Sequence, residues 1–393
     1  ANVLGMKGVE FMMDNGAKVP FRFCFGAPSC VPATQFETAG AALNVDEVAR
    51  LLDRPEVLYL SEMMNFPGVL NKDPEVMAKI KAAHDRNKPV DGHAPGLRGQ
   101  EAKAYAAAGI HTDHECFTLE EASDKLEAGM WIQIREGSAA RNFEALWPLL
   151  KTHPEKCMLC SDDKHPDSLV LGHINALVKR ALTKGVPLFN ALKAACLNPV
   201  KHYNIPLGLL REGDSADFIQ VASLEDFKVT GAWLEGRKIM GDDALPWPEV
   251  QETPINNFFA FDLKPEDFKV PVKNPKAALR VILPEDGQLI TREAHMVSTP
   301  QEGHWEPSPE QGLWKLAVVN RYRQAEPAVA FIGGLGIRCG ALAASVAHDS
   351  HNIVVAGTND SDMHAAVELL KQHQGGLALA CGAQSMVIPL PFG

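Results

Sequence analysis

The stretch LYLSEMMNFPGV, residues 58–69, is the first of four blocks that indicate the fold. In it, an apolar run ends at Glu62. Three later stretches repeat this form: VDGHAPG reaches His93, TDHEC reaches His114 and CMLCSDD reaches Asp162. A helix-like stretch separates each block from the next. A (β/α) barrel carries its functional side chains at the C-terminal ends of its strands. The repetition therefore predicts an α/β barrel with a metal-competent side chain at the end of four strands.

The alternation of strands and helices divides the chain into four regions. Residues 1–203 predict six strand–helix units, whereas a complete barrel has eight in about 250 residues, so we expect the first two units to be absent from this chain. Residues 204–241 have the short alternating strands of a small β domain. Residues 242–274 are rich in Pro, Asp and Asn and predict a linker, and residues 275–393 predict a C-terminal α+β domain.

The composition of the chain argues against some classes of binding partner. The formal net charge is −11 and no cluster of Lys and Arg stands out, which argues against a nucleic-acid or anionic-membrane surface. No apolar stretch is long enough to span a bilayer. Eight cysteines, several of them inside apolar runs, are typical of reduced thiols in a cytoplasmic protein. A small neutral or cationic ligand is the expected partner.

The side chains at the ends of the predicted strands suit a metal centre. Glu62 is followed by an apolar loop, and a carboxylate buried there without a cation would be costly. His93 or His114 alone would more often be a hydrogen-bonded core residue. Their place at consecutive strand ends, after a strand ending in a carboxylate, favours ligands. Imidazole with carboxylate suits Zn, Fe or Mn rather than Ca or Mg.

Two acidic residues, Asp162 and Asp163, end the last strand of the barrel region. Adjacent strand residues point to opposite sides, so at most one of them points into the barrel mouth. We favour Asp162 for the site, and we expect Asp163 to orient a neighbour or to cap the following turn. Cys157 and Cys160 fall inside the same strand as a CxxC pair, and we interpret both as core residues.

Two further stretches carry polar groups with more than one interpretation. IREGSAARN, residues 134–142, offers Arg135 and Ser138 to a polar ligand, or it is the capped start of a helix. HDSHN, residues 348–352, contains His348 and His351. It reaches over the barrel mouth, or it is a polar turn of the C-terminal domain.

Several blocks of the sequence are more specific than these patterns: NVLGMKG, PSCVPAT, EMMNFPGVLN, DGHAPGL, AGIHTDHE, IREGSAARN, DDKHPD, LREGDSADF and SVAHDSHNIVVAGTN. They resemble the bacterial adenine deaminases of the amidohydrolase superfamily over nearly the whole chain. The resemblance implies a metal-dependent (β/α)₈ TIM barrel that hydrolyses adenine to hypoxanthine and ammonia in purine metabolism. It also implies a binuclear divalent metal centre with Mn or Fe, or alternatively Zn, and we expect a homo-oligomer in the cytoplasm.

The resemblance also implies roles for single residues. Glu62 resembles the bridging metal ligand, His93 and His114 resemble two further ligands, and Asp162 resembles the acid/base that also touches metal. Candidates for contact with the substrate are Glu115, Arg135, Ser138, Asp163, His165, His348 and His351. Glu115 and His165 are the candidates for protonating the purine ring.

The chain departs from the family pattern in one respect. The HxH pair of the first strand, and a His-Glu just before NVLG, are not in this sequence. Two alternatives follow. One is another amidohydrolase acting on a cyclic amide or amidine, and the other is a non-catalytic scaffold built on an incomplete barrel.

Overall fold

The computed structural model describes residues 1–259, 261–274, 276–286 and 290–392. The chain forms two compact units. Unit 2 contains Glu10–Cys30 and Leu43–Gln251, and unit 1 contains Ala1–Val9, Val31–Ala42 and Glu252–Gly393. The two short N-terminal segments of unit 1 fall within the region that the sequence assigns to the barrel. Among the described residues, no helix combines the length and apolarity needed to cross a membrane.

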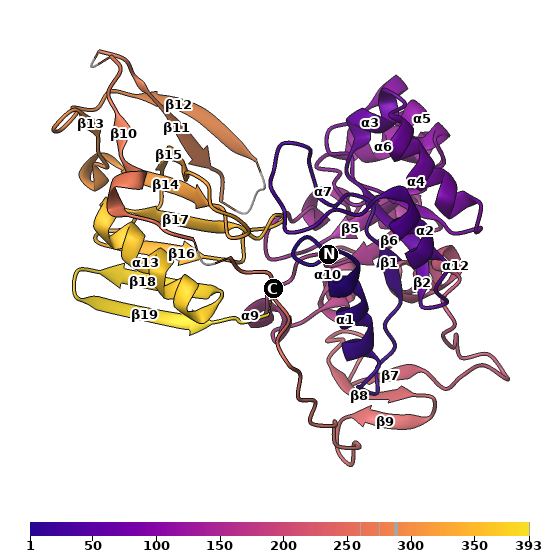
Figure 1. The fold of residues 1–393 in the computed structure, drawn as a ribbon. Coiled ribbons are helices and arrows are strands. Elements are labelled where there is room, and N and C mark those ends of the chain that lie inside the picture. Colours follow the sequence, from indigo (N-terminus) through magenta and orange to yellow (C-terminus); the bar gives the residue numbers. More distant parts are fainter. Residues whose placement is uncertain (260, 275, 287–289, 393) are drawn as a thin grey trace. The chain divides into compact units, whose positions relative to one another are not determined.

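Unit 2 begins with strands and helices that alternate along the chain (Figure 1). Its elements up to the fourth strand are α1 (Met6–Gly16, shared with unit 1), β1 (Phe25–Ala27), α2 (Val45–Leu52), β2 (Val57–Met63), α3 (Phe66–Leu70), α4 (Pro74–His84), β3 (Val90–Gly92), α5 (Gly99–Ala107) and β4 (Thr112–Asp113). There follow α6 (Leu119–Glu127), β5 (Trp131–Arg135), α7 (Phe143–Leu146), α8 (Leu149–Thr152), β6 (Cys157–Cys160), α9 (Pro166–Leu169), α10 (Ile174–Thr183), α11 (Leu188–Leu192), the π-helix η1 (Lys193–Leu197) and α12 (Asn198–Tyr203).

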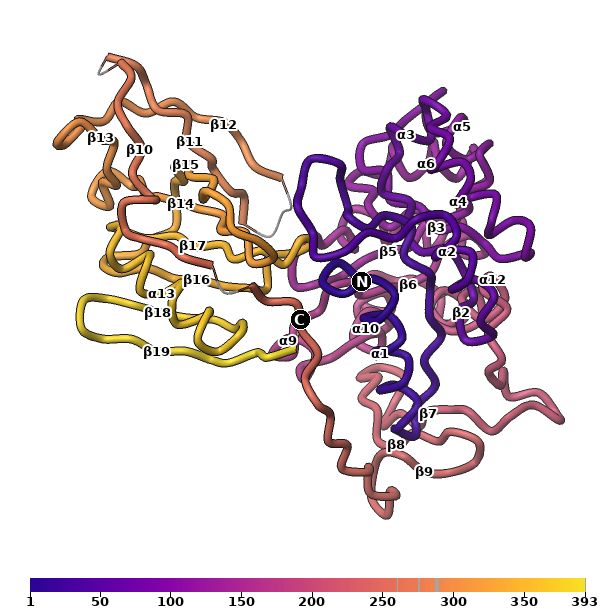
Figure 2. Tube along the Cα trace, in the orientation of Figure 1, coloured from indigo at the N-terminus to yellow at the C-terminus, as the bar shows by residue number. Residues whose placement is uncertain are grey.

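The strands of this alternating region are parallel. β1, β2 and β3 form one ladder and β4, β5 and β6 another, in chain order. The amide of His111, just before β4, donates to the carbonyl of Val90 in β3 at 2.9 Å, so the two ladders lie next to each other. Figure 2 shows the same progression along the chain from indigo to magenta. All six strands therefore present their C-terminal ends at the same edge.

Local sequence explains why helices follow these strands. Asn44 and Glu47 form a capping box at the start of α2, in which each side chain accepts from the other residue's backbone amide at 3.0 Å. Such a cap stabilises a helix by about 1 kcal/mol. Val48, Leu51 and Leu52 recur at helical spacing on the buried face of α2. α2 is thus fixed by its cap and by one apolar face.

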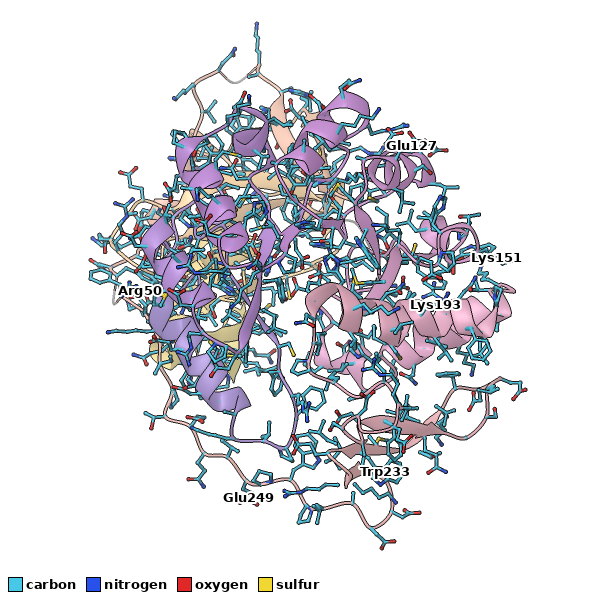
Figure 3. The ribbon with its side chains drawn as sticks, turned by 90° about the vertical axis from the view of Figure 1, so that its right-hand side faces the viewer. Arg50, Glu127, Lys151, Lys193, Trp233 and Glu249 are labelled. Atoms are coloured by element: carbon cyan, nitrogen blue, oxygen red, sulfur yellow. The ribbon has the colours of Figure 1, made fainter. Side chains whose placement is uncertain are left out.

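A small antiparallel sheet follows the alternating region. It consists of β7 (Phe218–Val221), β8 (Val229–Leu234) and β9 (Arg237–Met240). The rings of Phe218 and Trp233 stack with centroids 4.8 Å apart across β7 and β8, and Figure 3 labels Trp233 there. These strands lie within residues 204–241, for which the sequence predicts a small β domain.

Unit 1 is built on a mixed sheet of eight strands in the order β12-β11-β15-β14-β17-β16-β18-β19. Its elements are η2 (Pro265–Phe268), β10 (Val270–Pro271), β11 (Leu279–Pro284), β12 (Thr291–Met296), β13 (His304–Trp305), η3 (Pro309–Gln311), β14 (Leu313–Val319), β15 (Ala328–Gly333), β16 (Ala341–Ala344), β17 (Ile353–Gly357), α13 (Asp360–His373), β18 (Gly376–Cys381) and β19 (Gln384–Pro389). α13 packs on β16, β17 and β18 (Figure 1).

The segment predicted as a linker, residues 242–274, differs in its second half. Phe261, Leu263 and Phe268 are buried in the core that α13 forms with the sheet. The sequence pattern predicts a linker because Pro, Asp and Asn separate these apolar residues. In the structure all three pack in one core with residues of α13. Residue 275, where the sequence places the start of the C-terminal domain, lies outside the described residues.

Candidate active site

The four side chains singled out in the sequence all lie at the C-terminal ends of the parallel strands. Glu62 is the penultimate residue of β2, and His93 directly follows β3. His114 directly follows β4, and Asp162 comes two residues after β6. Ligands and catalytic groups of α/β folds gather at this edge, where loops from different strands converge.

Glu62, His93 and His114 form a close group. Oε2 of Glu62 lies 3.1 Å from Nδ1 of His93 and 3.2 Å from Nε2 of His114. The imidazole centroids are 5.1 Å apart, with the rings at 72°. Burial by itself would raise the pKa of Glu62, but hydrogen bonds from His114 and His93 hold that pKa well below its usual value. The carboxylate therefore stays ionised between two imidazoles.

A second group shares His114 and adds Glu115 and Asp162. Nε2 of His114 lies 3.3 Å from Oδ2 of Asp162 and 3.4 Å from Oε1 of Glu115. Burial lowers the pKa of His114, but contact with Glu62 and the charge of Asp162 outweigh it and raise the pKa overall. Nη1 of Arg135 contacts Glu115 and lies 3.0 Å from Asp162, so one buried cation serves both carboxylates.

These donors fit a divalent metal centre. In each group of three residues, one ligand atom per residue lies within 4.8 Å of the others. The donor set is imidazole nitrogen and carboxylate oxygen, which suits Mn, Fe or Zn. The raised pKa of His114 shows that the carboxylates around it favour a positive charge, which is also what a metal ion would supply.

The backbone that carries both histidines is held by a buried ion cluster around Lys125. Its Nζ donates to the carbonyl of Ala94 at 2.7 Å and pairs with Asp113 at 3.1 Å and Glu121 at 2.8 Å. Ala94 follows His93, and Asp113 also accepts from the amides of Ala94 and Glu115. Burial lowers the pKa of Lys125, but the charge of Asp113 outweighs it and raises the pKa above its usual value.

We expect Lys125→Met to destabilise unit 2 strongly. The side chain of Lys125 is fully buried, so the change leaves the buried carboxylates of Asp113 and Glu121 without their cation. Breaking a buried ion pair in this way costs about 3–5 kcal/mol. Urea denaturation should show this loss in the free energy of unfolding, whereas Lys103→Met, on the exposed face of α5, should be near neutral. Equal stability of the two variants would contradict the role of the cluster.

A cavity of about 370 Å³ lies beside Glu62, His114 and Asp162, within the size range of small-molecule sites. Its wall includes Asp91 and Tyr203, which the sequence analysis missed. The hydroxyl of Tyr203 donates to Asp91 at 2.8 Å. Burial raises the pKa of Asp91 to about 6, although this hydrogen bond and one from Thr112 oppose the change. The sequence did contain a sign of Asp91, because this acidic residue stands inside the apolar block VDGHAPG, directly before the site residue His93.

The remaining predicted residues lie in three settings. Glu115 belongs to the second group, and Arg135 contacts it. Ser138 contacts the loop after β6, in which Asp163 and His165 are exposed. His348 and His351 lie in unit 1, where Nδ1 of His348 is 2.7 Å from Oδ1 of Asp349. That HDSHN approaches the metal residues stays a prediction.

Comparisons with known proteins agree with these observations. Residues 1–239 match the model of the amidohydrolase family, and residues 288–393 match that of the adenine deaminase C-terminal domain. Among curated relatives, an adenine deaminase of Salinibacter ruber is 51% identical over all of this chain and 72% of its own length. An adenine deaminase of Parabacteroides distasonis is 47% identical over all of this chain and 71% of its own length.

Solved structures are more distant. A beta-aspartyl dipeptidase of Fervidobacterium islandicum has a TM-score of 0.40 at 15% identity, over 52% of this chain and 63% of that one. An N-acetyl-D-glucosamine-6-phosphate deacetylase of Mycobacterium smegmatis has a TM-score of 0.41 at 16% identity, over 51% of this chain and 60% of that one. The family models and the curated relatives carry the assignment: the chain belongs to the amidohydrolase family and, within it, to the adenine deaminases.

Proposed function

We propose that the protein hydrolyses adenine to hypoxanthine and ammonia at the edge where Glu62, His93, His114 and Asp162 meet. The observation that carries the proposal is the approach of His114 to both Glu62 and Asp162, at 3.2 and 3.3 Å. Membership of the adenine deaminases selects adenine among the substrates that such a site could take.

The site residues would hold a binuclear centre of Mn or Fe, with Zn as the alternative. Glu62, His93, His114 and Asp162 would hold the metal ions. The chemistry that divalent ions supply in such a site is Lewis acidity, which lowers the pKa of water to about 7. The anionic Glu62 between two imidazoles favours cation binding electrostatically.

Asp162 would move protons. Its carboxylate would accept a proton from the water that attacks C6 of the purine and would then deliver a proton to the departing amine. Arg135 and His114 hold Oδ2 of Asp162 from two sides, at 3.0 and 3.3 Å. The purine ring must also gain a proton as C6 becomes tetrahedral, and Glu115 and His165 are the proposed donors. Glu115 lies 3.4 Å from His114, on the same side as the metal residues.

The fold proposal follows from the strand order. We propose that β1 to β6 belong to a (β/α)₈ barrel, that β7 to β9 form a small β domain, and that the sheet with α13 is a C-terminal α+β domain. Cytoplasmic location and homo-oligomeric assembly are part of the proposal. All eight cysteines are free thiols in the structure, which supports a reducing compartment. Sedimentation of the purified protein tests the assembly.

Adenine should be a far better substrate than adenosine. The loop after Glu62 turns back tightly, because the amide of Met64 donates to Glu62 and that of Phe66 to Met64, at 2.9 and 2.8 Å. We propose that this loop covers the barrel mouth and leaves little room for a ribose. Ammonia release from both compounds by the full-length protein reconstituted with Mn²⁺ measures the preference. Comparable kcat/KM on adenosine would overturn the argument from the loop, and absence of ammonia from adenine would overturn the function.

A further inference from the structure

A loop on β5 holds the turn that carries Asp162. We infer that residues 136–142 are a positioning platform for Asp162 and that Ser138 is its main positioning residue, rather than a substrate contact. The inference rests on the proposed function for the role of Asp162. The contacts themselves are independent of that function.

The turn at Asp162 lies beyond the end of β6 and is bonded to a loop from another strand. β6 ends at Cys160, so Asp162 lies beyond the last ladder contact with β5. Its φ is +52°, in the left-handed region, and its own Oδ1 accepts from the amide of Asp163 at 2.8 Å, as short polar side chains do in this conformation. Strained conformations of this kind persist where neighbouring structure holds them.

Ser138 supplies much of that support. Its amide donates to the carbonyl of Asp163 at 3.0 Å, and its Oγ accepts from the amide of His165 at 2.9 Å. The amide of Glu136 donates to the carbonyl of Cys160 at 3.1 Å. Backbone atoms on both sides of Asp162 are thus bonded to the platform.

Gly137 allows the platform to approach the turn closely. A Cβ at this position would lie 3.0 Å from the carbonyl oxygens of both Ser161 and Asp163, and 2.7 Å from that of Ala139. Any side chain would therefore push the platform away from the carbonyls of Ser161 and Asp163, the residues on either side of Asp162. The contact between the platform and the turn uses both residues in this order. Gly137 allows the close approach, and the hydroxyl of Ser138 accepts from the amide of His165.

The other end of the platform is bonded to the segment that carries His114. Nδ2 of Asn142 donates to the carbonyls of His114 and Cys116, at 3.1 and 3.0 Å. Its Oδ1 accepts from the amide of Arg135 at 2.7 Å. Asn142 makes no side-chain cap to α7, so its buried amide serves this link. One loop thereby fixes His114 and Asp162 relative to each other.

The hydroxyl of Ser138 makes two hydrogen bonds, both to residues after β6. A serine hydroxyl has one donor hydrogen and two acceptor sites. The hydrogen of Ser138 is directed to Oγ of Ser168 at 3.2 Å, and the amide of His165 takes one acceptor site. One acceptor site remains, and the KM of Ser138→Ala tests whether substrate uses it. The hydroxyl is used within the loop that it holds.

The test compares Ser138→Ala with Ser138→Thr, which keeps a hydroxyl, in the full-length protein reconstituted with Mn²⁺. We expect Ser138→Ala to lower kcat on adenine by about 10–100-fold, because small misplacements of a reacting group cost up to about 10²-fold. KM should stay within about twofold of the wild-type value, because the change removes no contact with the bound substrate. Manganese content should be unchanged, and Ser138→Thr should recover most of the lost kcat. Ser123→Ala, which removes a hydroxyl bonded to Leu119 in α6, is the matched control and should leave kcat unchanged.

Hydrogen–deuterium exchange gives a readout that does not depend on catalysis. Ser138→Ala should speed exchange in residues 161–165, because the amide of His165 loses its acceptor, and Ser123→Ala should not. A rise in KM with kcat unchanged would make Ser138 a substrate contact and overturn the inference, as would unchanged exchange at 161–165. If the wild type releases no ammonia from adenine, the proposed function fails, and the exchange experiment still decides the platform.

Asn142 offers a second variant. Asn142→Ala should lower both stability and kcat, because it releases the His114 segment. Asn198→Ala is the matched control, since Asn198 is equally buried and donates to the carbonyls of Pro154 and Cys157 at 2.8 and 2.7 Å, where β6 begins. It should lower stability with kcat retained. Equal effects of the two changes on kcat would overturn the platform.

Discussion

Replacing Glu62 by Gln should remove metal and turnover together. Glu62 is the carboxylate shared by His93 and His114, with one oxygen 3.1 and 3.2 Å from their ring nitrogens. The amide has nearly the same shape but no charge, so the site loses its anionic ligand. Changing a residue that only hydrogen-bonds to a ligand already costs about 10–100-fold in metal affinity. Loss of the ligand itself should cost at least as much.

Metal analysis after dialysis, with ammonia release on the same samples, measures this effect. Glu56→Gln is the matched control, because Glu56 directly precedes β2 and its side chain is half-exposed beside Arg54. We expect Glu56→Gln to keep both metal and turnover. A Glu62→Gln protein that retained its full metal content would show that the centre is bound by other residues, and Glu62 would then lose its assigned role.

The strand-end residues could be predicted because their signal is local. Glu62, His93, His114 and Asp162 each interrupt an apolar run where a parallel strand ends, and the structure brings them to one edge. A pattern of this kind needs no knowledge of distant contacts. The family resemblance then supplied the reaction and the substrate.

Other parts of the site depend on packing that no local pattern reveals. Lys125 lies on the buried face of α6, and its partner Asp113 belongs to another element. Asn142 stands where a helix cap would be expected, yet its side chain bonds to the segment after β4. The division into two units is equally non-local, because Val31–Ala42 clusters with residues after Glu252. One contact that joins these distant segments is the hydrogen bond from the side chain of Asn352 to the carbonyl of Thr38, at 2.8 Å.

Asp162→Asn should cause the largest loss of turnover without a matching loss of metal. General acid/base catalysis contributes about 10²–10⁴-fold to rate, and an amide cannot replace the carboxylate in either proton transfer. The change isolates the charge, because Asn tolerates the left-handed backbone that Asp162 adopts at φ +52°. The platform contacts of the turn involve the backbone of Cys160, Asp163 and His165, so they should survive.

Asp163→Asn is the discriminating partner, since the two acids are adjacent and have the same charge. In the structure both acids are exposed, but Oδ2 of Asp162 lies 3.3 Å from His114 and 3.0 Å from Arg135, whereas the carbonyl of Asp163 accepts from Ser138. Turnover of Asp163→Asn should therefore fall far less than that of Asp162→Asn, with metal content close to wild type in both. If Asp163→Asn were instead the inactive, metal-replete variant, the proton-transfer role would belong to Asp163. The turn would then have to present the opposite face during catalysis, against the hydrogen bonds that Ser138 makes to it.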